Sequence, residues 1–160
     1  MKVNRVHTFR GLLASGGQHE IELERRVQNR AFKIRRLKIM SNTPFVPAVE
    51  HVAKIYTESQ SSINGTVDFS DVDLLAAATV ARPEAGVTPA EVAVAGGGQT
   101  LSVIIDGGLF SRNIFINGID LGGGAVALSY LIEVEEVKVT TAALMQIKLK
   151  VARKLSLQQD

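Results

Sequence analysis

The chain has 160 residues, of which 46% are apolar, and this suits one domain with a single buried core. It contains no cysteine, which excludes disulfides, thiol catalysis and cysteine-bound metals, and its apolar runs are far shorter than the roughly 20 residues of a membrane-spanning helix. The net charge of +2 hides an uneven layout: residues 1–38 hold ten Lys or Arg against three acids, residues 39–136 three against twelve, and residues 137–160 five against one.

The first predicted element is a flexible basic arm over residues 1–17, followed by a single domain over residues 18–160. The first nineteen residues contain no acid, and Gly16-Gly17 would break a helix. Residues 4–10 alternate like a strand, but loosely tied termini contribute little to the core of a domain. We therefore expect that deletion of the arm leaves the fold intact and weakens association.

Short strands are predicted along most of the chain by alternating polarity and by Val, Ile, Phe and Tyr content. Gly- and Pro-rich breakers separate them, and Asn64-Gly65 is the best tight hairpin turn. The predicted strands cover residues 4–10, 19–24, 31–40, 49–57, 66–70, 72–80, 100–106, 111–117 and 128–139.

Two of these strands carry matching charge doublets. The strand at 31–40 skips phase at Arg35-Arg36 and the strand at 128–139 at Glu135-Glu136, and a skip in phase is how a β-bulge reads in sequence. One strand is basic on its polar face and the other acidic. Because facing opposite charges contribute about 0.2–1 kcal/mol per pair, the two strands are expected to be neighbours. The predicted pairing involves Lys33, Arg35, Glu133 and Glu135.

After Val139 a helical stripe competes with strand alternation. Thr140 or Thr141 can cap a helix, and the Ala-Ala-Leu-Met-Gln run at 142–146 favours one, so we predict a short C-terminal helix. Eight or nine short strands with at most one helix indicate an all-β fold. Since the first long strand is expected beside the last, we predict an antiparallel β-sandwich of jelly-roll type.

No pattern of catalytic or metal-binding residues stands out. His7, His19 and His51 lie far apart, without the spacing that places two imidazoles on one metal. The cluster of Asp68, Asp71 and Asp73 lacks the glycine and distal glutamate of an EF-hand loop and is interpreted as a solvated turn. The sequence therefore predicts neither an enzyme nor a bound cofactor, metal or small-molecule substrate.

The basic N-terminal segment could contact phosphate groups without sequence preference. Aromatic residues make up only 5% of the chain and tryptophan is absent, so base stacking is poorly supplied. Non-specific contact with nucleic acid or a membrane through the arm is the expectation that remains.

A resemblance to a known family follows from the order of these elements. A basic strand follows an acid-free arm, an Arg-Asn-Ile-Phe-Ile-Asn strand at 112–117 leads to a Gly-rich loop, and Ser-Tyr-Leu-Ile-Glu-Val-Glu at 129–135 runs into a terminal helix. This order resembles jelly-roll capsid proteins of small tailless viruses, in particular those of bacteria. The resemblance implies a shell, vertex or cement subunit of a virion, assembled in the host cytoplasm from copies of itself and other capsid proteins.

The first hypothesis is thus a structural, self-assembling protein, and two others stay open. One is a β-sandwich module that binds a carbohydrate or protein through the loops at 58–66, 82–98 and 118–127; the other is an enzyme on a jelly-roll scaffold. For assembly, the predicted contacts are the arm residues and a basic edge: Lys2, Arg5, His7, Arg10, Arg25, Arg26 and Arg30.

Overall fold

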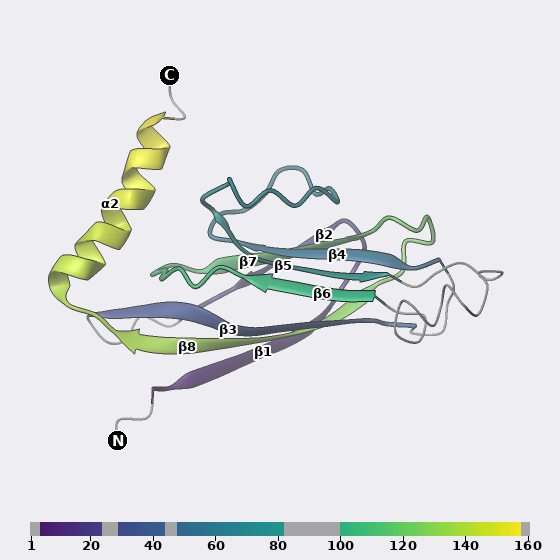
Figure 1. The fold of residues 1–160 in the computed structure, drawn as a ribbon, viewed down its shortest axis with the longest axis horizontal. Coiled ribbons are helices and arrows are strands. Elements are labelled where there is room, and N and C mark those ends of the chain that lie inside the picture. The colour runs from purple at the N-terminus through teal and green to yellow at the C-terminus, as the bar shows by residue number, and fades with distance from the viewer. Residues whose placement is uncertain (1–3, 24–28, 44–47, 82–99, 158–160) are drawn as a thin grey trace.

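In the computed structural model, which describes residues 4–23, 29–43, 48–81 and 100–157, two antiparallel sheets pack face to face (Figure 1). The three-stranded sheet has the order β1-β8-β3, and the five-stranded sheet has the order β2-β7-β4-β5-β6. The described elements are β1 (Val6–Leu13), β2 (Gly17–Ile21), β3 (Arg30–Ser41), β4 (Glu50–Tyr56), β5 (Leu74–Ala81), β6 (Thr100–Ile105), β7 (Ile114–Asp120), β8 (Leu128–Lys138) and α2 (Thr141–Leu157).

The predicted all-β fold and the C-terminal helix are confirmed. The predicted strand at 66–70 is wrong, and so is the tight hairpin at Asn64-Gly65, because residues 57–73 form one long loop between β4 and β5. The Asn64 side chain accepts hydrogen bonds from the Thr66 amide and from the amine of Lys54, which lies on the sheet below. A side chain that binds its own backbone two residues on shapes a loop as readily as a hairpin.

The pairing of the first long strand with the last is confirmed, since β3 and β8 are antiparallel neighbours. The register shifts between Ile34 and Arg36, so the bulge predicted at the arginine doublet is present. The bulge predicted at Glu135-Glu136 is wrong, because the ladder of β8 runs through both residues without a shift. Glu136 therefore shares the inward face of Val134.

The predicted flexible arm is wrong for the residues that form β1. This strand pairs with β8 from Val6↔Glu135 to Leu13↔Leu128, and Leu13 is fully buried (0% exposed). The domain accordingly begins with β1, ahead of the predicted boundary at residue 18. Residues 6–13 form a strand because they pair with β8 and bury alternate side chains. The absence of acidic residues prevents neither the pairing nor the burial.

A jelly roll is a long antiparallel hairpin rolled up, so it pairs strand 1 with 8, 2 with 7, 3 with 6 and 4 with 5. The β1–β8, β2–β7 and β4–β5 ladders follow this scheme. The β6 strand instead pairs with β5 and continues the five-stranded sheet. The two-sheet sandwich is thus established by its ladders, and the jelly-roll form stays a prediction.

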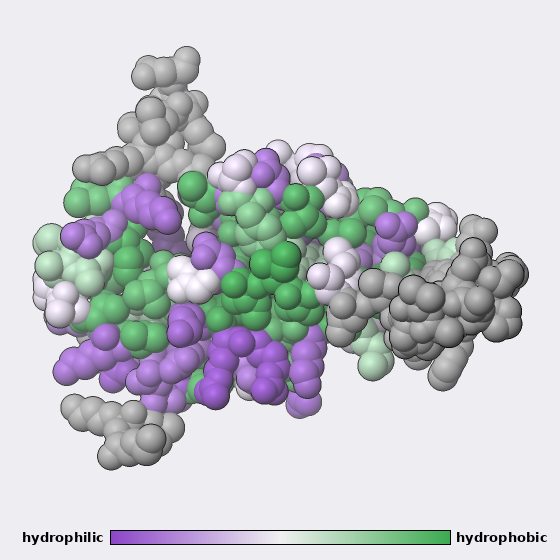
Figure 2. Space-filling model, viewed as in Figure 1, coloured by the Kyte–Doolittle hydropathy of each residue, from purple (hydrophilic) through white to green (hydrophobic). Residues whose placement is uncertain are grey.

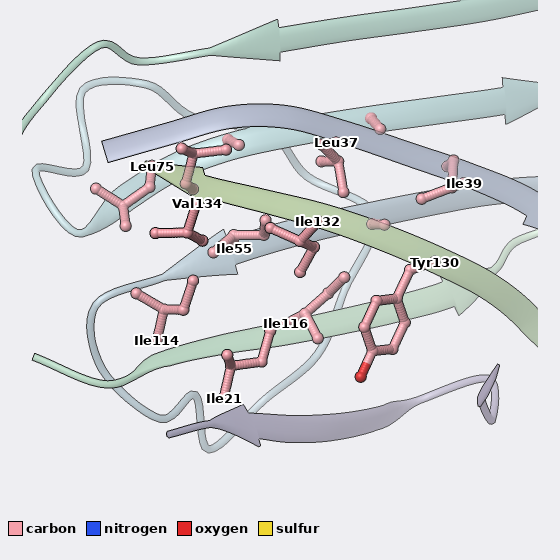
Figure 3. Packing of buried hydrophobic residues seen from close by; sticks show 14 of the residues in the cluster. Ile21, Leu37, Ile39, Ile55, Leu75, Ile114, Ile116, Tyr130, Ile132 and Val134 are labelled. Carbon is pink, nitrogen blue, oxygen red and sulfur yellow. The ribbon is translucent and has the colours of Figure 1, made fainter. Parts of the chain in front are cut away.

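The core lies between the two sheets (Figure 3). Ile55 and Ile116 from the larger sheet meet Ile132 and Val134 from β8, and all four are fully buried. Burial of each such side chain contributes about 1.5–3 kcal/mol. The inward faces of the sheets are thus occupied by the core, and the outward faces carry the surfaces that a partner can reach.

Candidate functional site

The outer face of the three-stranded sheet is charged in the half next to α2. Glu135 lies between Val6 and Lys33 in the register, and Glu133 lies between Thr8 and Arg36. Arg36 Nη1 is 3.3 Å from Glu133 Oε1, so Arg36, and not the predicted Arg35, is the cross-strand partner of Glu133. Arg35 is the extra residue of the bulge, so it has no partner residue in the register with β8.

The other half of this face has a different character. Arg10 and Lys38 both lie opposite Leu131, one on each side, and neither makes an ion pair within the described residues. In the next row, the exposed side chains of Leu12 and Met40 flank Ser129. Two cations that make no ion pair within the described residues therefore lie beside exposed apolar side chains.

A cavity of about 580 Å³ opens at this end of the sheet. Residues of β1, β3 and β8 line nearly all of it, with Val103 of β6, and most of the lining is apolar. We call its outward-facing residues Arg10, Lys38, Met40 and Leu131 the basic groove. Figure 2 shows a band of hydrophilic residues along the lower side of the molecule, where β1 and β8 lie in Figure 1.

The residues predicted for assembly contacts have separate positions. Arg10 lines the basic groove and Arg5 is exposed just before β1. His7 and Arg30 are engaged within the chain, because their side-chain nitrogens lie 3.2 and 3.4 Å from the carboxylate oxygens of Glu136. The structure therefore brings Arg10 alone of these residues into the groove; Lys2, Arg25 and Arg26 lie outside the described residues.

The opposite face of the sandwich carries an acidic and apolar segment. Residues 66–73, which we call the acidic loop segment, belong to the loop that lies over the outer side of the five-stranded sheet (Figure 1). Asp68 is exposed, and hydrogen bonds from the Ser70 hydroxyl and amide lower the pKa of its carboxyl. Val67, Phe69 and Val72 are exposed hydrophobic residues.

A buried lysine holds this loop on the sheet. Lys54 is only 3% exposed, and its amine donates to Asn64 Oδ1 at 3.1 Å and to the Thr66 carbonyl at 2.8 Å. Burial lowers the pKa of the amine, and the carboxylate of Asp71 partly opposes that effect. Since a buried cation without partners would be very costly, these bonds fix the start of the acidic loop segment.

Asp120 organises the glycine-rich loop where β7 ends. Its carboxylate accepts hydrogen bonds from the backbone amides of Glu50, Gly122 and Val126, at 2.9–3.1 Å. Burial acts to raise the pKa of Asp120, but these three bonds and the nearby His51 outweigh it, so that the pKa is lowered. Gly122 is required at its position, because a Cβ there would lie 1.6 Å from the carbonyl oxygen of Ala48.

His51 makes folding stability depend on pH. It is 1% exposed and lies opposite Asp120 in the β4–β7 register, and neither of its ring nitrogens has a hydrogen-bond partner among the described residues. Burial lowers the pKa of His51, against the opposing effect of Asp120. The unfolded chain then binds the proton more tightly, so stability is intact above the ordinary pKa and falls as the pH drops through it.

We therefore expect the urea midpoint to fall between about pH 7.5 and 5, and His51→Leu to flatten this dependence. The control is Ser62→Ala, at an exposed residue without a titratable group, which should keep the slope of the wild type. An unchanged slope in His51→Leu would contradict the assignment.

The described residues contain neither a candidate metal site nor a candidate membrane-spanning helix. Within them, no three side chains of His, Asp or Glu gather as a metal site would require. No helix in the same part of the chain is both long and apolar enough to cross a membrane. The arrangement of Arg10 and Lys38 suits the binding of a carboxylate or another anion by charge, beside an apolar surface.

Comparison of the chain with protein-family models, curated proteins and solved structures finds no match in any of the three. The basic groove is thus defined by the geometry of this chain alone. Sequence reasoning found Arg10 and missed Lys38, Met40 and Leu131. Their signal is the shared register of β1, β8 and β3, which requires β1 to be recognised as a strand of the sheet.

Proposed function

We propose that the protein is a structural, self-assembling subunit, and that its assembly is a viral capsid, in which it serves as a shell, vertex or cement protein. The observation that carries the proposal is the basic groove, where unpaired cations and exposed apolar side chains lie together on an outer sheet face. Such surfaces on a folded domain mark sites of association. In this proposal the chain performs no catalysis and holds no cofactor.

The helix α2 supports the same proposal. It stands away from both sheets (Figure 1), and it leaves Met145 and Leu149 exposed, one turn apart on one side. Lys148 and Lys150 are exposed on the same helix. A second uncovered apolar surface suits a subunit with several neighbours better than a monomer.

The capsid assignment rests on the order of the strands and on the resemblance drawn from it. Three of the four strand pairs of a jelly roll are present, and viral shells are among the assemblies built from that fold. The partners in this proposal are copies of the chain and other capsid proteins, within a virion assembled in the host cytoplasm. Contact of the N-terminal residues with nucleic acid or a membrane stays a prediction.

We expect light scattering of the purified protein at about 0.05 M salt to give a mass several times 17.2 kDa. At about 0.5 M salt the mass should fall, because the Debye length shortens and contacts made by Arg10 and Lys38 weaken. A mass of 17.2 kDa under both conditions would contradict self-assembly.

A second candidate function is a binding module, and one observation favours it. A polar pocket of about 350 Å³ lies beside the start of the predicted binding loop at 58–66. Glu58, Arg112, Asn113 and the aromatic residue Phe115 are among the residues that line it. Polar groups that converge around an aromatic ring suit a sugar or a peptide, so a monomeric protein should be screened against both.

A further inference from the structure

The basic groove and the acidic loop segment lie on opposite outer faces of the sandwich, and their chemistry is complementary. The groove belongs to the three-stranded sheet, and the segment lies over the five-stranded sheet (Figure 1). One face offers two cations that make no ion pair within the described residues, beside apolar side chains, and the other offers the exposed carboxylate of Asp68 beside apolar side chains. We propose that the acidic loop segment of one copy binds in the basic groove of the next.

The charges match between the two surfaces. Arg10 and Lys38 flank Leu131 from two sides, so an anion above Leu131 lies within reach of both cations. The exposed carboxylate of Asp68 can occupy that position, because within the described residues it accepts hydrogen bonds from the hydroxyl and backbone amide of Ser70 alone, in the same turn. Charge-assisted bonds of this kind are about twice as strong as neutral ones.

The apolar side chains match as well. Phe69 is 40% exposed and Met40 is 62% exposed, so neither is covered within one chain. Pockets of about 300–1,000 Å³ hold ligands of drug size, so a cavity of about 580 Å³ admits a phenyl ring and its neighbours. Val72 on the segment and Leu12 at the rim of the groove extend this contact.

The segment is held in shape before it binds. Lys54 ties its start to the sheet, and the hydroxyl of Thr57 donates to Asp73 Oδ1 at 2.9 Å near its end. A Ser70 hydroxyl bond of 2.6 Å fixes the turn at Asp68 between these points. Because little conformational freedom is left to lose, binding costs less entropy than it would for a flexible loop.

In this proposal the copies associate head to tail. A groove on one face and its ligand on the opposite face make the contact heterologous, so a pair of bound copies still offers one free groove and one free segment. Such contacts continue from copy to copy and produce closed rings or open stacks. This inference rests on the proposed self-assembly and specifies the surfaces that carry it.

The test uses two variants of the full chain, each with one surface disabled. The groove variant carries Arg10→Glu and Lys38→Glu, and the segment variant carries Asp68→Lys and Phe69→Ser; all four residues are exposed, so the fold should tolerate the changes. Each variant alone should associate at least about tenfold more weakly than the wild type. An equimolar mixture should form heterodimers of twice the monomer mass that grow no further, because one working groove meets one working segment.

The control variant carries Arg35→Glu and Lys138→Glu, which changes the charge as much as the groove variant does, at two exposed cations outside the groove, the segment and α2. It should assemble like the wild type. If the wild type assembles and the groove or segment variant assembles equally well, the inference is overturned and the proposed function stands. A mixture that stays monomeric also overturns the inference. So does a wild type that binds anionic vesicles as a monomer, if the groove variant loses that binding. A wild type that is monomeric in all conditions overturns both.

Discussion

Deletion of residues 1–17 is expected to leave a chain that does not fold. The deletion removes all of β1, which pairs with β8 along its whole length, and it removes Gly17 at the start of β2. The edge of β8 would then be open, and the core would lose the fully buried Leu13. Since a domain is stable by about 5–15 kcal/mol in total, this loss exceeds what the remaining contacts can absorb.

Circular dichroism and urea titration of the truncated protein would check this result. A cooperative transition with the midpoint of the full chain would show instead that residues 1–17 are an independent arm. A milder variant separates lost packing from lost chain: Leu13→Ala should reduce the free energy of unfolding by about 2–5 kcal/mol. Its neighbour Leu12 is 52% exposed and provides the matched control, for which a change within about 0.5 kcal/mol is expected.

Asp120→Ala is expected to reduce the free energy of unfolding by about 3 kcal/mol. The substitution leaves the backbone amides of Glu50, Gly122 and Val126 without an acceptor, and each unsatisfied buried group costs about 1–3 kcal/mol. The glycine-rich loop is exposed at residues 121–125, so water can replace part of what is lost. The total cost for the three amides is therefore expected near the lower end of that range, at about 1 kcal/mol for each.

Asp120→Asn is the matched variant. One oxygen can still accept the amides of Glu50 and Gly122, but the new amide group would face the N–H of Val126, where two donors oppose each other. We expect the free energy of unfolding of Asp120→Asn, measured by urea denaturation, to lie between those of the wild type and Asp120→Ala. Equal stability of all three proteins would show that the carboxylate does not hold the loop.

The sequence was most informative for β3 and β8, where the charge pattern and the alternation of polar and apolar residues point to the same arrangement. The arginine doublet marks a bulge, and the opposite charges on the polar faces of β3 and β8 identify the two strands as neighbours. Both signals are local, and both depend on side-chain periodicity. The glutamate doublet has the same appearance but no bulge, because Glu136 turns inward, where His7 and Arg30 compensate its charge. A sequence pattern does not show whether a charge will find a partner in the interior.

The basic groove could not be predicted because it depends on three strands that are distant in sequence. Arg10, Leu131 and Lys38 become neighbours only through the β1–β8 and β8–β3 registers. The acidic cluster at residues 68–73 was recognised as a turn, and the structure agrees. Its place on the opposite face follows from Lys54, a buried charge that a sequence pattern would assign to the surface.

The central position of β8 in the three-stranded sheet means that this sheet cannot form until β8 has been synthesised. Its partners β1 and β3 are translated long before Leu128–Lys138, and at about 5–20 residues per second the ribosome needs on the order of ten seconds to supply their missing neighbour. Throughout that interval β1 and β3 lack the strand that lies between them, and either of them can pair with another nascent chain. Chaperone capture and slow translation of the segment before β8 therefore become determinants of yield.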